Sequence, residues 1–256
     1  MRLEKTKQFI TNWLTEYAQQ NQMKTLVIGV SGGIDSALTS TLCAETELKT
    51  IVISMPIHQK KNEIDNATTH MNWLKKHYKN IQCETIDLSN TFEMYKKVIP
   101  IKFHSELSLA NTRARLRMMT LYQIAGQVKG LVVGTGNKIE DFGIGFFTKY
   151  GDGGVDISPI ADLTKSEVKK LAAFCGIQNC ILNATYTDGL WEDGRSDEEQ
   201  IGATYKELEW AMNYKKGDKI TKRGKEVLNI YNKLHQQNKH KINPIPVCNI
   251  PKVLKN

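Results

Sequence analysis

Short apolar runs alternate with amphipathic segments from residue 25 to residue 134, and this alternation limits the folds open to the chain. The apolar runs predict buried strands, and the segments between them have helical spacing. Strands that alternate with helices form parallel sheets with right-handed crossovers. We therefore predict an α/β fold, doubly wound, with helices on both faces of a mainly parallel sheet. The predicted strands are 26–30, 51–53, 81–88 and 131–133, and the helices between them are 36–45, 62–77 and 111–128.

The segments outside this region are mostly helical. Residues 3–20 carry apolar side chains at steps of three and four, which predicts an amphipathic helix before the first strand. After the sheet, helices are predicted at 165–175, 197–212 and 219–237. No internal repeat, low-complexity tract or linker interrupts the chain, so we expect one domain over residues 1–256.

Composition excludes several classes of protein but does not identify the ligand. The apolar runs are shorter than the roughly 18 residues of a membrane span, and the polar N-terminus lacks the apolar core of a secretory signal. We therefore predict a cytoplasmic protein that contacts no membrane. Five cysteines without a CxxC pair disfavour zinc and a disulfide framework. The formal charge of +8 suits a nucleic acid, an acidic membrane surface or a phosphorylated small molecule equally well.

The stretch from Gly29 to Ser36 lies between the first strand and its helix. Backbone N–H groups of such a loop, together with the helix N-terminus, bind phosphate oxygens. No lysine follows Gly33, so the Walker pattern is absent, and the spacing of the dinucleotide fingerprint is also absent. Serine hydroxyls and backbone amides remain to bind pyrophosphate, and Asp35 is available to hold a bridging Mg²⁺.

A second glycine-rich stretch, GTGNKIEDFGIGFFTKYGDGG, follows the strand at 131–133. It contains seven of the eighteen glycines of the chain. Both glycine-rich stretches follow strands, so we expect them at the same edge of the sheet, where ligands of α/β proteins bind. A long loop in a compact domain is usually functional or disordered, and its aromatic and charged residues favour function.

The sequence SGGIDS after the first strand resembles the pyrophosphatase loop of enzymes that split ATP into AMP and pyrophosphate. GMP synthetase, asparagine synthetase, argininosuccinate synthetase, tRNA-thiolating enzymes and NAD synthetase share it. The motifs NTRARLRM, TDGLWEDGRSDEEQIG and HKINPIP, together with the second glycine-rich stretch, are similar to those of the NAD synthetase family. They occur in order over most of the chain.

This resemblance implies a fold like that of the adenine-nucleotide α-hydrolases, with five strands. It also implies a reaction in which ATP adenylates the pyridine carboxylate of deamido-NAD and releases pyrophosphate. Ammonia then displaces AMP to give NAD, which is the last step of NAD biosynthesis. The enzymes of this family are homodimers, in which the helix corresponding to 111–128 lies at the interface and the dinucleotide crosses it.

The resemblance also assigns roles to single positions. Asp35 and Glu140 would hold Mg²⁺, and Asp35 and Lys165 would act in catalysis. Lys165 lies at a helix start, where the helix dipole disfavours a cation, so a phosphate partner accounts for it better than the fold does. The predicted ATP contacts are Gly29, Val30, Ser31, Gly32, Gly33, Ile34, Asp35, Ser36, Thr135, Lys165 and Thr187. The predicted deamido-NAD contacts are Arg115, Lys149, Asp156, His240 and Lys241.

Two departures from the family pattern concern the loop around Thr187. Tyr186 stands where many relatives have proline, which makes Thr187 the weakest of these assignments. Residues 189–196 also differ from many relatives, and a lid over the site is one interpretation of them.

The nitrogen donor and the substrate class leave alternatives open. Only 28 residues precede Gly29, too few for a fused glutaminase, so we expect free ammonia as the donor unless a separate glutaminase subunit supplies it. A tRNA-modifying enzyme of the same superfamily would suit the positive charge, but we see neither a catalytic cysteine pair nor an added RNA-binding domain. A non-catalytic, nucleotide-sensing or nucleic-acid-binding module that kept the fold is disfavoured because Asp35 and Glu140 are both present. We therefore expect ATP, deamido-NAD and ammonia as ligands, and no nucleic acid.

Overall fold

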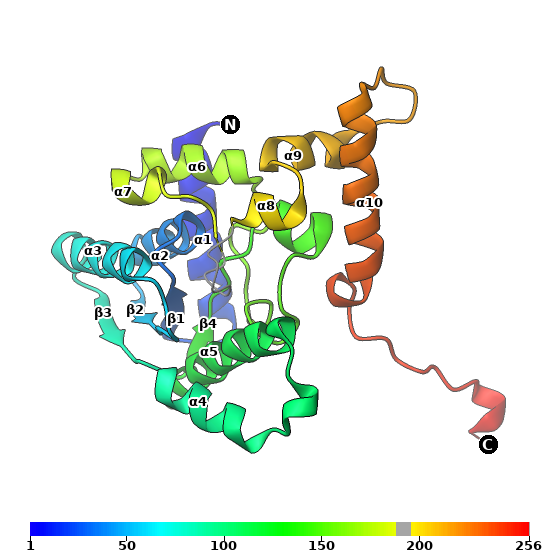
Figure 1. Ribbon diagram of the computed structural model, residues 1–256. Helices are drawn as coiled ribbons and strands as arrows, with labels where there is room; N and C mark the ends of the chain where they lie inside the picture. The colour runs from blue at the N-terminus through cyan, green and yellow to red at the C-terminus, as the bar shows by residue number, and fades with distance from the viewer. Residues whose placement is uncertain (188–195, 256) are drawn as a thin grey trace.

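The computed structural model of the chain describes residues 1–187 and 196–255. Its sheet has four parallel strands in the order β3-β2-β1-β4, so the first strand lies inside the sheet (Figure 1). Val27 of the first strand pairs with Ile51 on one side and with Val132 on the other. The strands are β1 (Thr25–Val30), β2 (Lys49–Ser54), β3 (Ile81–Thr85) and β4 (Gly130–Val132).

Five strands were expected, but the sheet of the described residues has four. Among the described residues, a single parallel bridge between Val133 and Ile157 extends the sheet beyond β4. Pro159 follows two residues later. Because proline has no N–H to donate to a ladder, it limits the length of a strand at this point. The doubly wound parallel architecture is confirmed, with a shorter sheet edge than expected.

The two faces of the sheet bury alternate residues of its strands, as the pleat requires. Leu26 and Ile28 face one hydrophobic cluster, which contains residues of four longer helices and of the short helix at Asn179–Leu182. Val27 faces a second cluster, which contains residues of two helices. Figure 1 shows these helices as layers on either side of the sheet. The first layer is α1 (Leu3–Gln20), α2 (Ile34–Ala44), α3 (Lys61–His77) and α6 (Lys165–Phe174); the second is α4 (Ser89–Val98) and α5 (Glu106–Val128).

A third hydrophobic cluster joins the second glycine-rich stretch to the C-terminal helices. Part of that stretch forms a π-helix, η2 (Ile139–Ile144), which packs against α9 (Tyr205–Asn213) and α10 (Lys222–Ile242). The single helix predicted over 197–212 is wrong. Gly202, at φ +82°, ends α8 (Asp197–Ile201), and Thr204 caps the start of α9. Shorter elements are α7 (Asn179–Leu182), η1 (Ile101–Phe103) and η3 (Lys252–Leu254).

Two properties of the described residues concern membranes and metals. None of the helices in this part of the chain is both long and apolar enough to cross a membrane. All five cysteines are free thiols, and the described residues contain no group of three or more His, Cys, Asp or Glu side chains arranged to hold a metal.

Candidate active site

A cavity of about 1060 Å³ lies at the carboxyl ends of the strands. The loops that follow β1, β2 and β4 line it, together with one face of α5, the start of α6 and the end of α10. This is the edge at which open α/β sheets bind their ligands. Both glycine-rich stretches meet here, as the sequence predicted.

The loop after β1 is shaped by its own hydroxyl groups and by one glycine. Ser36 Oγ accepts from the N–H of Ser31 and donates to the carbonyl of Gly33, which is the N-cap of α2. Gly32 has φ +89°, and a Cβ there would lie 2.4 Å from the carbonyl oxygen of Glu63 in α3. Only glycine fits this position, because the backbone of the loop packs directly against the backbone of the first turn of α3. The remaining N–H groups and the start of α2 are available to an anion.

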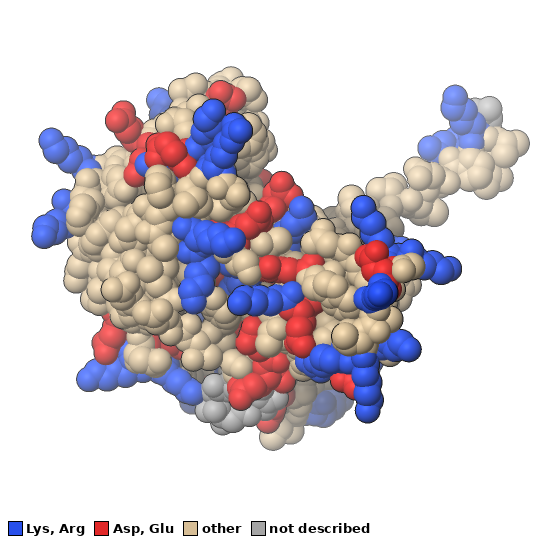
Figure 2. Space-filling view, turned by 90° about the horizontal axis from the view of Figure 1, so that it is seen from above, with Lys and Arg blue, Asp and Glu red and all other residues tan. Residues whose placement is uncertain are grey.

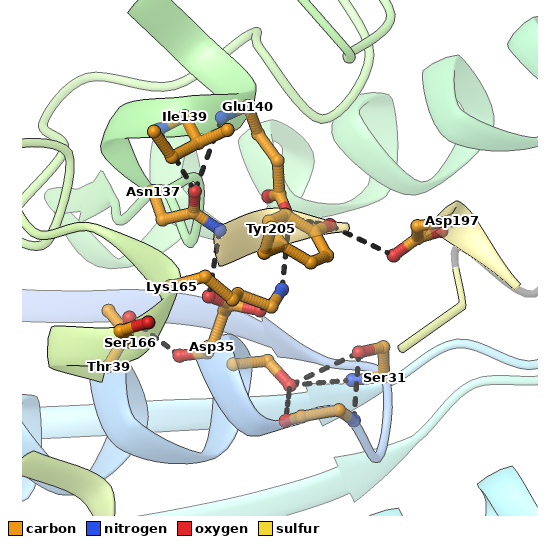
Figure 3. Close-up of polar contacts among 12 residues, drawn as sticks. Ser31, Asp35, Thr39, Asn137, Ile139, Glu140, Lys165, Ser166, Asp197 and Tyr205 are labelled. Carbon is orange, nitrogen blue, oxygen red and sulfur yellow. Dashed lines mark hydrogen bonds and ion pairs between the residues drawn. The ribbon is translucent and has the colours of Figure 1, made fainter. Parts of the chain in front are cut away.

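A buried lysine between two carboxylates forms the centre of the cavity wall. Lys165 Nζ lies 2.6 Å from Asp35 Oδ2 and 2.9 Å from Glu140 Oε1 (Figure 3). Burial by itself lowers the pKa of Lys165, but the two carboxylates outweigh it and raise that pKa above its ordinary value. Burial raises the pKa of Asp35, and the Lys165 charge opposes this shift. The cluster therefore joins α2, η2 and α6 through one ammonium group.

Two uncharged side chains hold the carboxylates in place. Asn137 donates from Nδ2 to Asp35 Oδ1 at 3.1 Å, and its Oδ1 accepts the backbone N–H groups of Ile139 and Glu140. Tyr205 Oη donates to Glu140 Oε1 at 2.6 Å (Figure 3). Oε1 thus receives Lys165 and Tyr205 together, and these contacts leave the second oxygen of Glu140 free for other partners. Burial and the nearby carboxylates raise the pKa of Tyr205, so its hydroxyl stays protonated as a donor.

The sequence interpretation did not assign roles to these two residues. Asn137 ends the stretch GTGN at the sheet edge. A side-chain amide at that position could have indicated a residue that both donates and accepts hydrogen bonds in the site. Tyr205 lies 65 residues from Glu140 along the chain and is buried. Its position in an amphipathic helix is typical of a core residue, so nothing in the sequence pattern alone separates it from the core.

The donor set fits Mg²⁺ bound together with a nucleotide. Mg²⁺ usually binds through one or two carboxylates plus phosphate oxygens and water. Asp35 and Glu140 supply two carboxylates from separate loops, both bound to the same ammonium group. Phosphate oxygens and water would complete the coordination of the ion.

A third carboxyl group, Asp141, follows Glu140 in the π-helix and lines the same cavity. It packs against Gly136, where a Cβ would lie 2.3 Å from its carboxylate oxygens. Burial and the neighbouring charge of Glu140 raise the pKa of Asp141 to about 8. The group is therefore largely protonated at neutral pH and can donate a hydrogen bond into the cavity. The sequence analysis did not single it out.

Four of the predicted dinucleotide contacts lie together where α5, the glycine-rich loop and the end of α10 meet. Lys149 Nζ donates to the carbonyl of His240 at 2.7 Å, and Lys241 Nζ donates to the carbonyl of Phe147. Arg115 donates from Nε and Nη2 to the carbonyl of Lys149, at 3.3 Å each. All four side chains line the cavity.

The remaining predicted contacts are placed differently. Thr135 and Thr187 line the cavity. Asp156 is outside its lining: Oδ1 accepts from the Tyr122 hydroxyl at 3.0 Å, and Oδ2 accepts from the N–H of Val132 in β4. The predicted lid over 189–196 lies, except for its last residue, outside the described residues.

The charge distribution on the face seen from above is mixed. Figure 2 shows Lys and Arg side chains interspersed with Asp and Glu across this face. On this face the net charge of +8 is therefore not gathered into one continuous basic surface.

Comparison with known proteins places this geometry in a family. The family model described as NAD synthase matches residues 6–245. The NH(3)-dependent NAD(+) synthetase of Alkaliphilus metalliredigens is 36% identical over 252 residues, which covers 94% of this chain and 96% of that protein. The solved structure of NMN synthetase from Francisella tularensis has a TM-score of 0.88 at 31% identity and covers 98% of this chain and 100% of that one. The NH3-dependent NAD synthetase of Campylobacter jejuni, in complex with nitrate, is similar in fold, with a TM-score of 0.76 at 24% identity, and covers 97% of this chain and 100% of that one.

Proposed function

The chain belongs to the NAD synthase family, and on that premise we propose how its cavity converts deamido-NAD to NAD with ammonia and ATP. It is an NH3-dependent NAD synthetase by homology, a ligase that forms a C–N bond. The observation that carries our account of the site is the Asp35–Lys165–Glu140 cluster beside the loop after β1. A basic group and a carboxylate pair next to a loop suited to phosphate suit a reaction that cleaves ATP between its α- and β-phosphates.

The two half-reactions place different demands on the site. A carboxylate resists attack by an amine, so one of its oxygens first attacks the α-phosphorus of ATP and pyrophosphate leaves. Ammonia then attacks the carbonyl carbon, and AMP leaves with that oxygen. The protein mainly positions the reactants and stabilises the charge that develops.

We assign the ATP side of the cavity to the loop after β1 and to the buried cluster. Backbone N–H groups from Gly29 to Ser36 would bind the pyrophosphate, with Thr135 and Thr187 as further nucleotide contacts. Asp35 and Glu140 would hold Mg²⁺, which when bound neutralises charge on the phosphate oxygens. The ammonium group of Lys165 lies between these two carboxylates and would bind the phosphates as they separate.

We assign the dinucleotide side to Arg115, Lys149, His240 and Lys241, whose groups meet at one end of the cavity. Asp156 faces away from this cavity in the single chain, so we propose that it contacts substrate only across a dimer interface. A homodimer formed through α5, as the family resemblance implies, would provide that arrangement. One domain over residues 1–256, a cytoplasmic location and a separate glutaminase as an alternative source of the ammonia also remain proposals.

A second candidate substrate comes from the comparison with the Francisella tularensis protein, which is described as an NMN synthetase. Nicotinic acid mononucleotide carries the same pyridine carboxylate without the adenylate half. We favour the dinucleotide because the sequence relatives are described as NAD(+) synthetases. The cavity, at about 1060 Å³, also lies at the upper limit of ordinary ligand sites.

Steady-state kinetics with both acids tests this proposal. The purified protein, ATP and Mg²⁺ would be supplied with ammonium or with ammonia-free glutamine, and amide product, AMP and pyrophosphate would be quantified. We expect kcat/KM for deamido-NAD to exceed that for the mononucleotide, with ammonium as the effective donor. A higher kcat/KM for the mononucleotide would overturn the choice of substrate. The Asp35→Asn variant is the control, and it should lose activity with both.

A further inference from the structure

Two arginines of α5 support opposite walls of the cavity. Arg115 donates to the carbonyl of Lys149, on the wall assigned to the dinucleotide. Arg117 donates to the segment that follows β2: its Nε lies 2.9 Å from the carbonyl oxygen of Met55, and its Nη2 lies 2.8 Å from Gln59 Oε1. Arg117, Met55 and Gln59 all line the cavity, but the site predicted from the sequence does not include them.

The carbonyl of Met55 lies where β1 leaves the sheet. We call residues 55–60 the β2 segment. The carbonyls of the residues before and after Met55 accept from N–H groups of the chain that follows β3. Successive carbonyls of a strand point to opposite sides. The Met55 carbonyl therefore points toward β1, whose ladder with β2 ends at the pair Val30–Ser54. Arg117 Nε takes the place of a strand partner there, because a buried carbonyl needs a donor.

The second contact of Arg117 decides how the side-chain amide of Gln59 is oriented. A guanidinium group carries donors only, so the oxygen of the amide has to face it. The amide nitrogen Nε2, with its two N–H groups, then faces away from Arg117, and it makes no hydrogen bond to the described residues. Because Gln59 lines the cavity, these N–H groups are available to a ligand that accepts hydrogen bonds.

The arrangement of the sheet leaves the β2 side of the cavity for the nucleoside of ATP. β1 lies between β2 and β4, and the loop after β1 is the proposed pyrophosphate site. The groups assigned to the dinucleotide belong to the stretch after β4 and to α5 and α10, which pack against β4 and η2 respectively. Adenine ring nitrogens and ribose oxygens accept hydrogen bonds, so an amide donor on the β2 segment is complementary to them.

We propose that Arg117 is a positioning residue, which holds the β2 segment and orients Gln59 so that its amide N–H groups donate to the adenosine half of ATP. The inference rests on the proposed function, because it takes the loop after β1 as the pyrophosphate site. It adds a contact on the nucleoside side of the same ligand. Since Arg115 and Arg117 belong to one helix, α5 supports the walls for both substrates.

Gln59→Glu separates the donor from the scaffold. The substitution keeps an oxygen for Arg117 and removes the N–H groups that would face the nucleoside. Binding of α,β-methylene-ATP with Mg²⁺, measured by calorimetry, reports on the contact without any turnover. We expect this binding to weaken at least about tenfold, with a melting temperature no lower than that of the wild type.

Asn62→Asp is the matched control, because it makes the same change from amide to carboxylate at another residue of the cavity wall. It should leave the dissociation constant of the analogue within about threefold of the wild-type value. Equal losses in the two variants would assign the effect to charge alone. That result, or binding by Gln59→Glu within about twofold of wild type, would overturn the proposal.

Arg117→Met tests the positioning role. It should weaken binding of the analogue at least about tenfold, and adding Gln59→Glu should weaken it no more than about twofold further, since the amide is no longer held. Additive losses would mean that the two residues act independently and would overturn the positioning role. The control is Arg113→Met in the same helix, which should bind the analogue like the wild type, because Arg113 lies over the Phe92 ring and outside the cavity lining.

Steady-state kinetics separates this inference from the proposed function. Arg117→Met should raise the KM for ATP at least about tenfold and leave the KM for deamido-NAD within about twofold. Equal increases in the two KM values would indicate a general disturbance of the cavity and would contradict the inference. A wild-type protein that binds the analogue but forms no NAD would refute the proposed function, while the calorimetric comparison would still decide the roles of Arg117 and Gln59.

Discussion

Replacing Tyr205 with phenylalanine removes one hydroxyl group and keeps the ring. The hydroxyl lies 2.6 Å from Glu140 Oε1 and 3.2 Å from Asp197 Oδ2, and both contacts are lost. The ring remains over Lys165 Nζ, 4.6 Å from the ring centroid. A hydrogen bond to a charged group contributes about 1.5–3 kcal/mol, which corresponds to roughly 10- to 100-fold in an equilibrium constant. Glu140 Oε1 keeps its contact with Lys165, so the carboxylate is not left without a partner. We therefore expect an effect in the lower part of that range, about 10- to 30-fold.

The effect should appear in the dependence on metal rather than in folding. If Tyr205 orients Glu140 toward Mg²⁺, the Mg²⁺ concentration that half-activates ATP-dependent amidation should rise by that factor. Binding of Mn²⁺ in the presence of ATP, followed by electron paramagnetic resonance, should weaken in parallel without any turnover. Residues that orient metal ligands typically change metal affinity by about 10–100-fold.

Tyr186→Phe is the matched control. The Tyr186 ring packs edge-on against Tyr205 and also lies over Lys165, but its hydroxyl makes no hydrogen bond to the described residues. Removing that hydroxyl should leave the metal dependence unchanged. Equal losses in the two variants, or an unchanged metal dependence in Tyr205→Phe, would refute the positioning role.

Two other perturbations follow from the structure. Gly32→Ala should abolish ATP binding measured by calorimetry, because its Cβ would lie 2.4 Å from the Glu63 carbonyl at a positive φ; binding within twofold of wild type would contradict this account of the loop. Burial lowers the pKa of His70, which lies between Ser40 and Gln178, to about 4. Native His70 therefore binds fewer protons than the unfolded chain between pH 4 and 6.5, and the free energy of unfolding should decrease as the pH falls through that window, by up to about 3 kcal/mol. Urea unfolding of His70→Gln should show a smaller decrease, and an unchanged one would exclude His70 as its source.

The sequence was most informative where local pattern decides the structure. The strand at 25–30 and the loop after it could be predicted because a short apolar run, glycine and serine act over a few residues. Lys165 lies at a helix start that is unfavourable for a cation, and a phosphate was predicted as its partner. In the single chain its ammonium group contacts two carboxylates instead.

The features that sequence analysis missed depend on contacts between distant segments. Tyr205 reaches Glu140 only because α9 packs on the π-helix, and no local pattern encodes that packing. The break between α8 and α9 depends on a positive φ at Gly202, an isolated glycine that a helical pattern tolerates. Asp156 matched the family motif, yet its carboxylate is bound to β4 and Tyr122 in the single chain. A motif identifies a residue, but a partner subunit can still decide what that residue contacts.

The most direct test of the central claim follows an oxygen atom from substrate to product. Deamido-NAD labelled with ¹⁸O in both oxygens of its pyridine carboxylate would be converted by the protein with ATP, Mg²⁺ and ammonium, and the products analysed by mass spectrometry. Our account predicts one ¹⁸O in each AMP formed, none in pyrophosphate, and one AMP for each NAD. Label that appears in inorganic phosphate together with ADP, or unlabelled AMP, would contradict an adenylate intermediate in this cavity.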